Sequence, residues 1–168
     1  PDMKNYDIDR ILRPAFKLFL MYNYESVSTA KLEEETGLTR GAIFFKHKSK
    51  EALFTAVVDR YVLEFKPGFT EVNDVDTLKS FIDAFLADTS RRMDEMCLLG
   101  VPNVQRGYFN LLYQALKYYP EADIKIQAMF GASLKIWENI IQKAKESGEI
   151  KPTCDVHKTA LQFRYLYS

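Results

Sequence analysis

The most informative segment of this 168-residue chain is residues 27–54, which read VSTAKLEEETGLTRGAIFFKHKSKEALF. Ser28 is a typical helix N-cap, and the residues after it predict a short helix that ends at Gly37. Thr39 is a second N-cap candidate, for a helix that continues to about His47. Two short helices joined by a glycine bend are typical of a helix-turn-helix, whose second helix lies in the major groove of DNA.

The same segment carries a local positive charge, although the whole chain is neutral, with 23 Lys+Arg and 23 Asp+Glu. Between residues 38 and 50 the charged side chains are all basic, at Arg40, Lys46, Lys48 and Lys50. Phosphate binding uses such cations together with backbone N–H groups at helix starts. Gly41 and Ala42 are small, which lets a helix approach base edges closely. These features favour DNA binding, and the alternative is an ordinary solvated basic face.

An ordered set of residues between positions 10 and 62 is shared with a known protein family. Its members in this chain are Ile11-Leu12, Ala15, Leu18-Phe19, Tyr24, Ser28, Gly37-Leu38-Thr39, Arg40-Gly41-Ala42-Ile43 and Lys48 to Phe54. On these residues the segment resembles the N-terminal domain of the TetR family of transcriptional regulators. The rest of the chain resembles the family only in its number of helices and in the break at residues 147–150.

The resemblance implies a homodimeric repressor whose two heads reach successive major grooves of a palindromic operator. Carried over by position, the residues that would face DNA are Thr39, Arg40, Gly41, Ala42, Phe45 and Lys46. Phosphates would be held by Ser28, Thr29 and Lys50. Phe44 and Lys48 complete the implied DNA-binding set.

Three residues depart from the family pattern. Phe44 stands where the family usually has Tyr, and His47 stands where it usually has Phe. Glu33 takes a position that helix-turn-helix units usually fill with a small Ala, so we expect it to weaken DNA binding or to shift the helix packing. These departures leave a second interpretation open, in which the chain is a helical protein-interaction or sensor module that has kept the fold and lost DNA binding.

Helical spacing of apolar residues continues along the chain and predicts an all-α fold. We expect a helix-turn-helix domain over residues 1–48, a connecting helix over 49–66, and an effector-binding and dimerisation domain over 67–168. We also expect the natural chain to continue past residue 168. Pro14 predicts a kink or a late start of the first helix. Gly107 is assigned, with the Gly and Pro residues before it, to a loop.

The family resemblance further implies that the body binds a small-molecule effector and forms the dimer. Candidate effector-binding residues are Phe85, Met96, Leu99, Phe109, Tyr113, Met129, Phe130 and Trp137. Tyr113 and Trp137 are the preferred pair, because a buried Tyr or Trp needs a polar partner that a ligand could supply. The candidate dimer interface is Val156, Ala160, Phe163 and Tyr167. For both sets, a place in the ordinary hydrophobic core is the alternative.

The composition favours no enzyme class. The two histidines, His47 and His157, lie far apart, and the sequence has no Gly-rich phosphate loop and no metal-ligand spacing. We therefore expect no catalytic residues, no metal and no cofactor. Cys97 and Cys154 are expected to be free thiols in a reducing cytoplasm. The family resemblance implies that this is the cytoplasm of a bacterium, with the protein near the nucleoid. No apolar run approaches the roughly 20 residues that a membrane-spanning helix needs.

Overall fold

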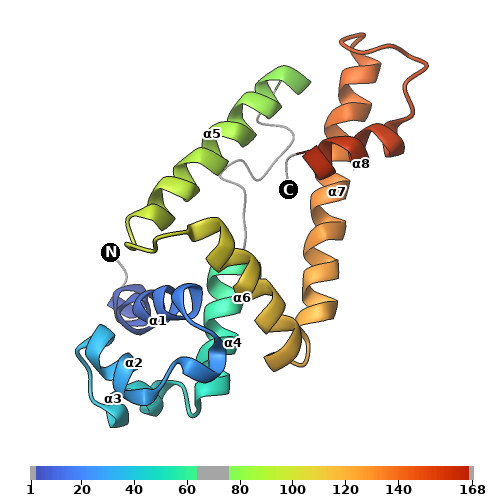
Figure 1. The fold of residues 1–168 in the computed structure, drawn as a ribbon. Coiled ribbons are helices and arrows are strands. Elements are labelled where there is room, and N and C mark those ends of the chain that lie inside the picture. Colours follow the sequence, from blue (N-terminus) through green and yellow to red (C-terminus); the bar gives the residue numbers. More distant parts are fainter. Residues whose placement is uncertain (1–2, 64–75, 167–168) are drawn as a thin grey trace. The chain divides into compact units, whose positions relative to one another are not determined.

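The computed structural model describes the backbone of residues 3–63 and 76–166, with side chains from residue 9 onward. Within these ranges the chain consists of helices and short connections, and no strand is present (Figure 1). This confirms the predicted all-α class, with a helix-turn-helix followed by a helical body. Among the described residues, no helix is long and apolar enough to cross a membrane.

The chain divides into two compact units. The head unit contains residues 1–65 and 93–123, and the body unit contains residues 66–92 and 124–168. The boundary that we predicted between residues 66 and 67 falls within residues 64–75, which lie outside the described part of the chain. The division into a domain 1–66 and a domain 67–168 therefore stays a prediction.

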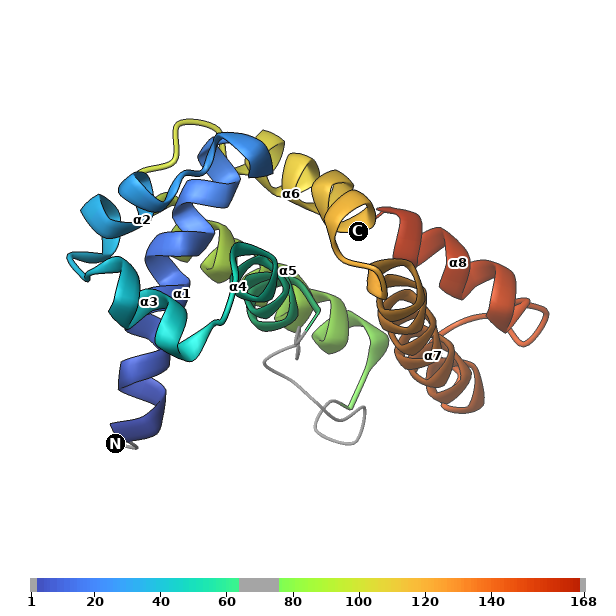
Figure 2. The same cartoon turned by 90° about the horizontal axis from the view of Figure 1, so that it is seen from below.

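The head unit is built on the apolar face of its first helix. Its elements are α1 (Met3–Met21), η1 (Tyr24–Ser26), α2 (Thr29–Thr36), α3 (Arg40–Lys46), α4 (Lys50–Val58), η2 (Asp59–Leu63) and α6 (Val104–Tyr118). Helix α1 contacts α2, α4 and α6, and α2 contacts α3 (Figure 2). Ala15 and Phe19 of α1 are fully buried, as are Leu32 of α2 and Phe54 of α4. Burial of this shared core fixes where the short α2–α3 pair lies.

The structure answers two sequence expectations about helix interruptions in the head unit. Helix α1 begins at Met3 and contains Pro14, so the late start is wrong, because the buried residues on both sides of the proline offset its lost hydrogen bond, and a kink at Pro14 stays a prediction. Gly107 lies inside α6, not in a loop. A Cβ atom at Gly107 would be 2.7 Å from the Leu20 carbonyl oxygen. The glycine is there because α6 and α1 approach so closely.

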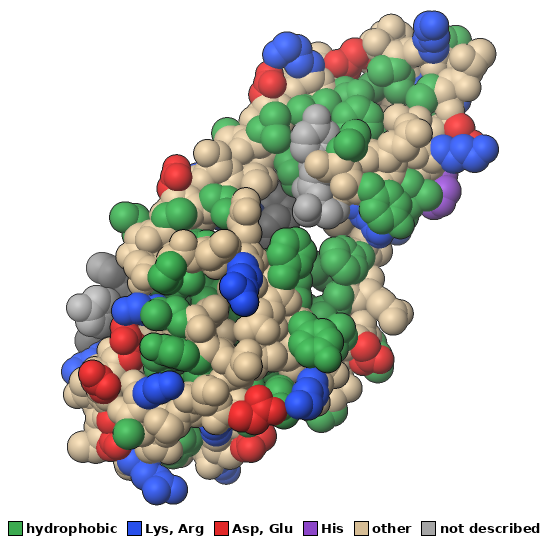
Figure 3. Space-filling model, in the orientation of Figure 1, with side chains coloured by type: hydrophobic (Ala, Val, Ile, Leu, Met, Phe, Trp, Pro, Cys, Tyr) green, Lys and Arg blue, Asp and Glu red, His purple; other side chains and the backbone are tan. Residues whose placement is uncertain are grey.

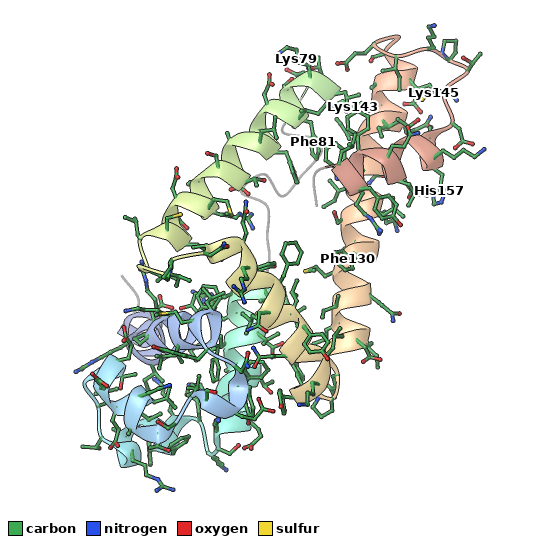
Figure 4. The ribbon with its side chains drawn as sticks, viewed as in Figure 1. Lys79, Phe81, Phe130, Lys143, Lys145 and His157 are labelled. Atoms are coloured by element: carbon green, nitrogen blue, oxygen red, sulfur yellow. The ribbon has the colours of Figure 1, made fainter. Side chains whose placement is uncertain are left out.

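The body unit packs around one aromatic side chain. It contains α5 (Leu78–Cys97) up to residue 92, α7 (Ala122–Glu146) from residue 124, and α8 (Val156–Leu166). Trp137 of α7 meets Phe81 edge to face at 4.9 Å and stacks on Phe163 at 5.3 Å between ring centroids. Figure 4 shows Phe81 pointing from α5 towards the α7–α8 pair. The three helices are thus joined through one buried indole ring.

Candidate nucleic-acid interface

Helices α2 and α3 begin and end at the residues that the sequence predicts. The Ser28 hydroxyl accepts a hydrogen bond from the Lys31 N–H at 3.3 Å, and the Thr39 hydroxyl accepts one from the Ala42 N–H at 3.3 Å. Gly37 ends α2 in the left-handed region, with φ of +66°. Because both hydroxyls act as acceptors towards the backbone, their O–H hydrogens stay available for an external acceptor such as a phosphate.

One face of α3 is buried and the opposite face is open. Ile43 is fully buried and anchors the helix in the head unit. Gly41 and Phe45 are each about 160° away from Ile43 around the helix axis, since successive residues turn by about 100°. Gly41, Ala42 and Phe45 are exposed, and Phe45 is 90% exposed. Helix α3 therefore presents a small-residue face with one large aromatic side chain to the outside.

The implied DNA-binding residues all lie on α2, α3 and the start of α4. The exposed members are Ser28, Thr39, Arg40, Gly41, Ala42, Phe45, Lys46 and Lys48. The half-buried members are Thr29, Phe44 and Lys50. Figure 3 shows basic and acidic side chains together in its lower part, where Figure 1 shows α2 and α3. The structure thus brings the set onto one part of the head unit, and its DNA contacts stay a prediction.

Lys50 differs from the other cations of the set. Its ammonium group lies 4.4 Å from the centroid of the Tyr24 ring, a cation–π contact at the edge of the head core. Burial lowers the pKa of Lys50, and the negative charges of Glu25 and Glu51 partly offset this decrease. A phosphate contact by Lys50 would have to be made from this half-buried position, whereas Arg40, Lys46 and Lys48 are exposed.

Glu33 has a role that the sequence does not reveal. Its carboxylate oxygen accepts a hydrogen bond of 2.6 Å from the backbone N–H of Arg40, the first residue of α3. An acidic group at a helix start is stabilising, because it satisfies an N–H group without an intrahelical partner and interacts with the helix dipole. Glu33 thus links α2 to α3, and its effect on DNA binding stays a prediction. The signal in the sequence would have been its spacing of seven residues from Arg40.

His47 follows α3 as a half-buried side chain. Its Nε2 atom is buried and has no hydrogen-bond partner among the described residues. Burial lowers the pKa of His47, and the positive charge of Lys46 lowers it further. The imidazole is therefore favoured in its neutral form.

Helix α6 supports the head in a way that the sequence did not indicate. Gln114 is the buried polar residue of the described chain, and its side-chain oxygen accepts a hydrogen bond from the backbone N–H of Tyr24. Nearby, the Lys117 ammonium lies 3.2 Å from the Glu25 carboxylate. These contacts join residues about 90 positions apart, so no local pattern could have predicted them. They hold α6 against the turn that follows α1.

The candidate effector residues fall in both units. Met96, Leu99, Phe109 and Tyr113 lie in the head unit, and Phe85, Met129, Phe130 and Trp137 lie in the body unit. Tyr113 is 70% exposed, so the argument from a buried hydroxyl does not apply to it. Trp137 is buried against three aromatic rings of its own unit, those of Phe81, Phe85 and Phe163. Effector binding by these residues stays a prediction.

The candidate dimer residues on α8 mostly turn towards their own unit. Ala160 is fully buried, and Phe163 stacks on Trp137. Val156 packs against the same cluster, and Tyr167 lies outside the described residues. The large apolar residues that α8 exposes are Tyr165 and Leu166. A dimer interface on this helix stays a prediction, and the geometry directs it to those two residues.

Comparison with known protein families identifies the segment that contains α2 and α3. Residues 11–57 match the family model of the bacterial regulatory proteins of the tetR family. The N-terminal domain of this chain belongs to the TetR family. This match confirms the resemblance deduced from the sequence, and it covers α2, the glycine turn and α3 of the TetR-family head. No solved structure matches the chain significantly.

Two curated relatives share this TetR-family head. The HTH-type transcriptional repressor ComR of Escherichia coli (strain K12) is 42% identical over 62 residues, which are 37% of this chain and 30% of ComR. The HTH-type transcriptional repressor AcnR of Corynebacterium efficiens is 32% identical over 73 residues, which are 44% of this chain and 39% of AcnR. The match thus spans about a third of the length of these relatives.

Proposed function

We propose that this chain is a transcriptional regulator that binds duplex DNA by placing α3 in the major groove. The observation that carries the proposal is the outward face of α3. There small residues lie beside exposed Arg40 and Lys46, and Ile43 anchors the helix from behind. A helix with a small face approaches base edges, while cations at its ends neutralise phosphates.

The same proposal includes a repressor that acts as a homodimer on a palindromic operator in the bacterial cytoplasm. Both relatives are named as transcriptional repressors, and the TetR-family head supports a similar role for this chain. We further propose that a small-molecule effector releases the operator. Binding would favour a head separation that no longer matches grooves about 34–36 Å apart.

Selection of bound sequences from random duplex DNA tests the proposal directly. We expect an enriched palindromic motif, since a two-fold symmetric dimer contacts two equal half-sites. Affinity for the selected duplex should fall steeply as salt rises, because phosphate contacts release counterions. A helical interaction module that has lost DNA binding would instead bind no duplex even at low salt.

Charge-removing variants connect the binding to α3. Arg40→Gln and Lys46→Gln should each weaken duplex binding and lower the salt slope by about one. Lys151→Gln is the matched control, because Lys151 is an exposed lysine of the body unit. Unchanged affinity in both α3 variants, with folding verified by circular dichroism, would contradict the proposal.

The effector is tested separately from DNA binding. Compounds that raise the melting temperature of the free protein are collected first, since a ligand of the folded state stabilises it by mass action. Each is then added to the protein–operator complex, and we expect release of the duplex. Compounds that stabilise the protein and leave operator affinity unchanged would argue against effector control.

A further inference from the structure

Phe45 is the most exposed large hydrophobic side chain of the described residues, at 90% exposure. Phe45 is not part of the head core, because α3 packs into that core through Ile43 on its opposite side. An exposed aromatic ring is suited to binding, since it offers a large apolar area at low conformational cost. The position of Phe45 therefore calls for an apolar group on whatever α3 contacts.

The residues one turn before Phe45 on α3 have no side chain that can form hydrogen bonds. Gly41 and Ala42 lie one turn earlier on the same side of α3, and long side chains on a helix lean towards the preceding turn. A Cβ atom added at Gly41 would meet no neighbour closer than the Thr39 hydroxyl at 4.0 Å. The middle of this face is thus an open, purely apolar strip, formed by Gly41, Ala42 and Phe45.

The chemistry of the major groove limits what such a strip can recognise. Its base edges present hydrogen-bond donors and acceptors, and the apolar group among them is the C5-methyl of thymine. Arg40 and Lys46, at the two ends of α3, and Lys48 just after it are exposed, and their charges are complementary to the phosphates on either side of a groove. Charge complementarity therefore favours duplex DNA as the occupant of this face.

We propose that Phe45 is a specificity-determining residue that recognises the 5-methyl group of a thymine in each operator half-site. This inference rests on the proposed DNA-binding function and adds the chemistry of the readout. The same methyl group occurs on 5-methylcytosine, so the recognised chemistry is a pyrimidine 5-methyl group, with thymine as the committed source. Discrimination comes from apolar contact, and the hydrogen-bonding pattern of the base contributes nothing to it at this position.

Replacement of each operator thymine by deoxyuridine tests the proposal, because it removes one methyl group and keeps every hydrogen-bonding group. At the position where the methyl group is recognised, replacing the thymine of one half-site should lower wild-type affinity roughly fourfold. This is the effect of losing the burial of one methyl-sized group. In Phe45→Ala the thymine and uracil duplexes should bind equally. Phe45→Leu, which keeps an apolar side chain, should retain part of the difference.

Lys46→Gln is the matched control, because a lost phosphate contact should weaken the thymine and uracil duplexes by the same factor. A second arm compares cytosine with 5-methylcytosine at the sensitive position. If the methyl group alone is read, methylation should recover roughly fourfold in affinity. If methylation has no effect there while thymine still exceeds uracil, the hydrogen-bonding groups of the base take part in the discrimination, and recognition by apolar contact alone is contradicted.

Two results would overturn the inference while the proposed function stands. One is a salt-dependent operator complex that is insensitive to uracil at every thymine. The other is a uracil penalty that persists in Phe45→Ala, which would assign the methyl contact to another residue. Failure to bind any duplex at low salt would refute the proposed function and this inference with it. Circular dichroism of Phe45→Ala should match the wild type, since the side chain is outside the core.

Discussion

The head unit and the body unit bury their apolar side chains in different ways. In the head, buried residues come from α1, α2, α3, α4 and α6, so many side chains share the packing. In the body, the buried set is a cluster of seven residues with Trp137 at its centre. In the head, many side chains share the packing, and capping residues set where the helices begin and end. In the body, the stability of the core depends on the Trp137 ring.

The largest expected effect is the loss of that ring. Trp137→Ala should destabilise the protein by about 4 kcal/mol, the usual cost of removing a fully buried large aromatic side chain. Phe130→Ala, on the same helix but 39% exposed, is the control and should cost less than about 1 kcal/mol. Urea unfolding followed by far-ultraviolet circular dichroism measures both. Equal losses would show that the body core does not depend on Trp137.

A pair of glycines provides the next test, in which the two units should respond with opposite signs. Gly107→Ala in the head should cost about 2 kcal/mol, because its Cβ would press on the Leu20 carbonyl. Gly131→Ala in α7 meets nothing within 4 Å and should stabilise by about 0.5 kcal/mol through the lower entropy of the unfolded chain. Thermal unfolding of the two variants measures both changes in stability. A neutral Gly107→Ala would mean that α6 and α1 separate easily.

His47 tests whether the head tolerates a buried polar atom. His47→Phe should raise stability by about 1.5 kcal/mol, since an unpartnered buried nitrogen is removed. The folded-state pKa of His47 lies below its ordinary value of 6.5, so the unfolded chain binds the proton more strongly. Wild-type stability should therefore be complete above pH 6.5 and decline as the pH falls below it. If the stability of the variant declines by the same amount at low pH, His47 is not the cause of the decline.

The smallest effect concerns one cap. Thr39→Ala should cost about 1 kcal/mol, because the Ala42 N–H loses its acceptor at the start of α3. Thr39→Ser keeps the hydroxyl and should restore most of the loss. Chemical denaturation of the three proteins provides the comparison. If the alanine variant is as stable as the wild type, the Glu33 contact to Arg40 alone holds the start of α3.

The sequence predicted what depends on neighbours three or four residues away. Ser28, Gly37 and Thr39 mark helix ends because each acts on backbone groups of its own turn. The contact of Gln114 with Tyr24 joins distant residues, and no local rule indicates it. In α6 the candidate effector residues Phe109 and Tyr113 are both exposed. The helix buries the side that carries Gly107, because a small residue permits the closest approach to α1.

Trp137 is the single tryptophan of the 168 residues, and it is 2% exposed. Its fluorescence is consequently a natural spectroscopic reporter for the body unit, while the head unit contains only tyrosine and phenylalanine as aromatic chromophores. A change in the indole emission on adding a compound would indicate that the surroundings of α7 had changed. A compound bound beside Trp137 would change this emission directly, whereas a duplex bound to α3 would change it only through a conformational change passed to the body unit.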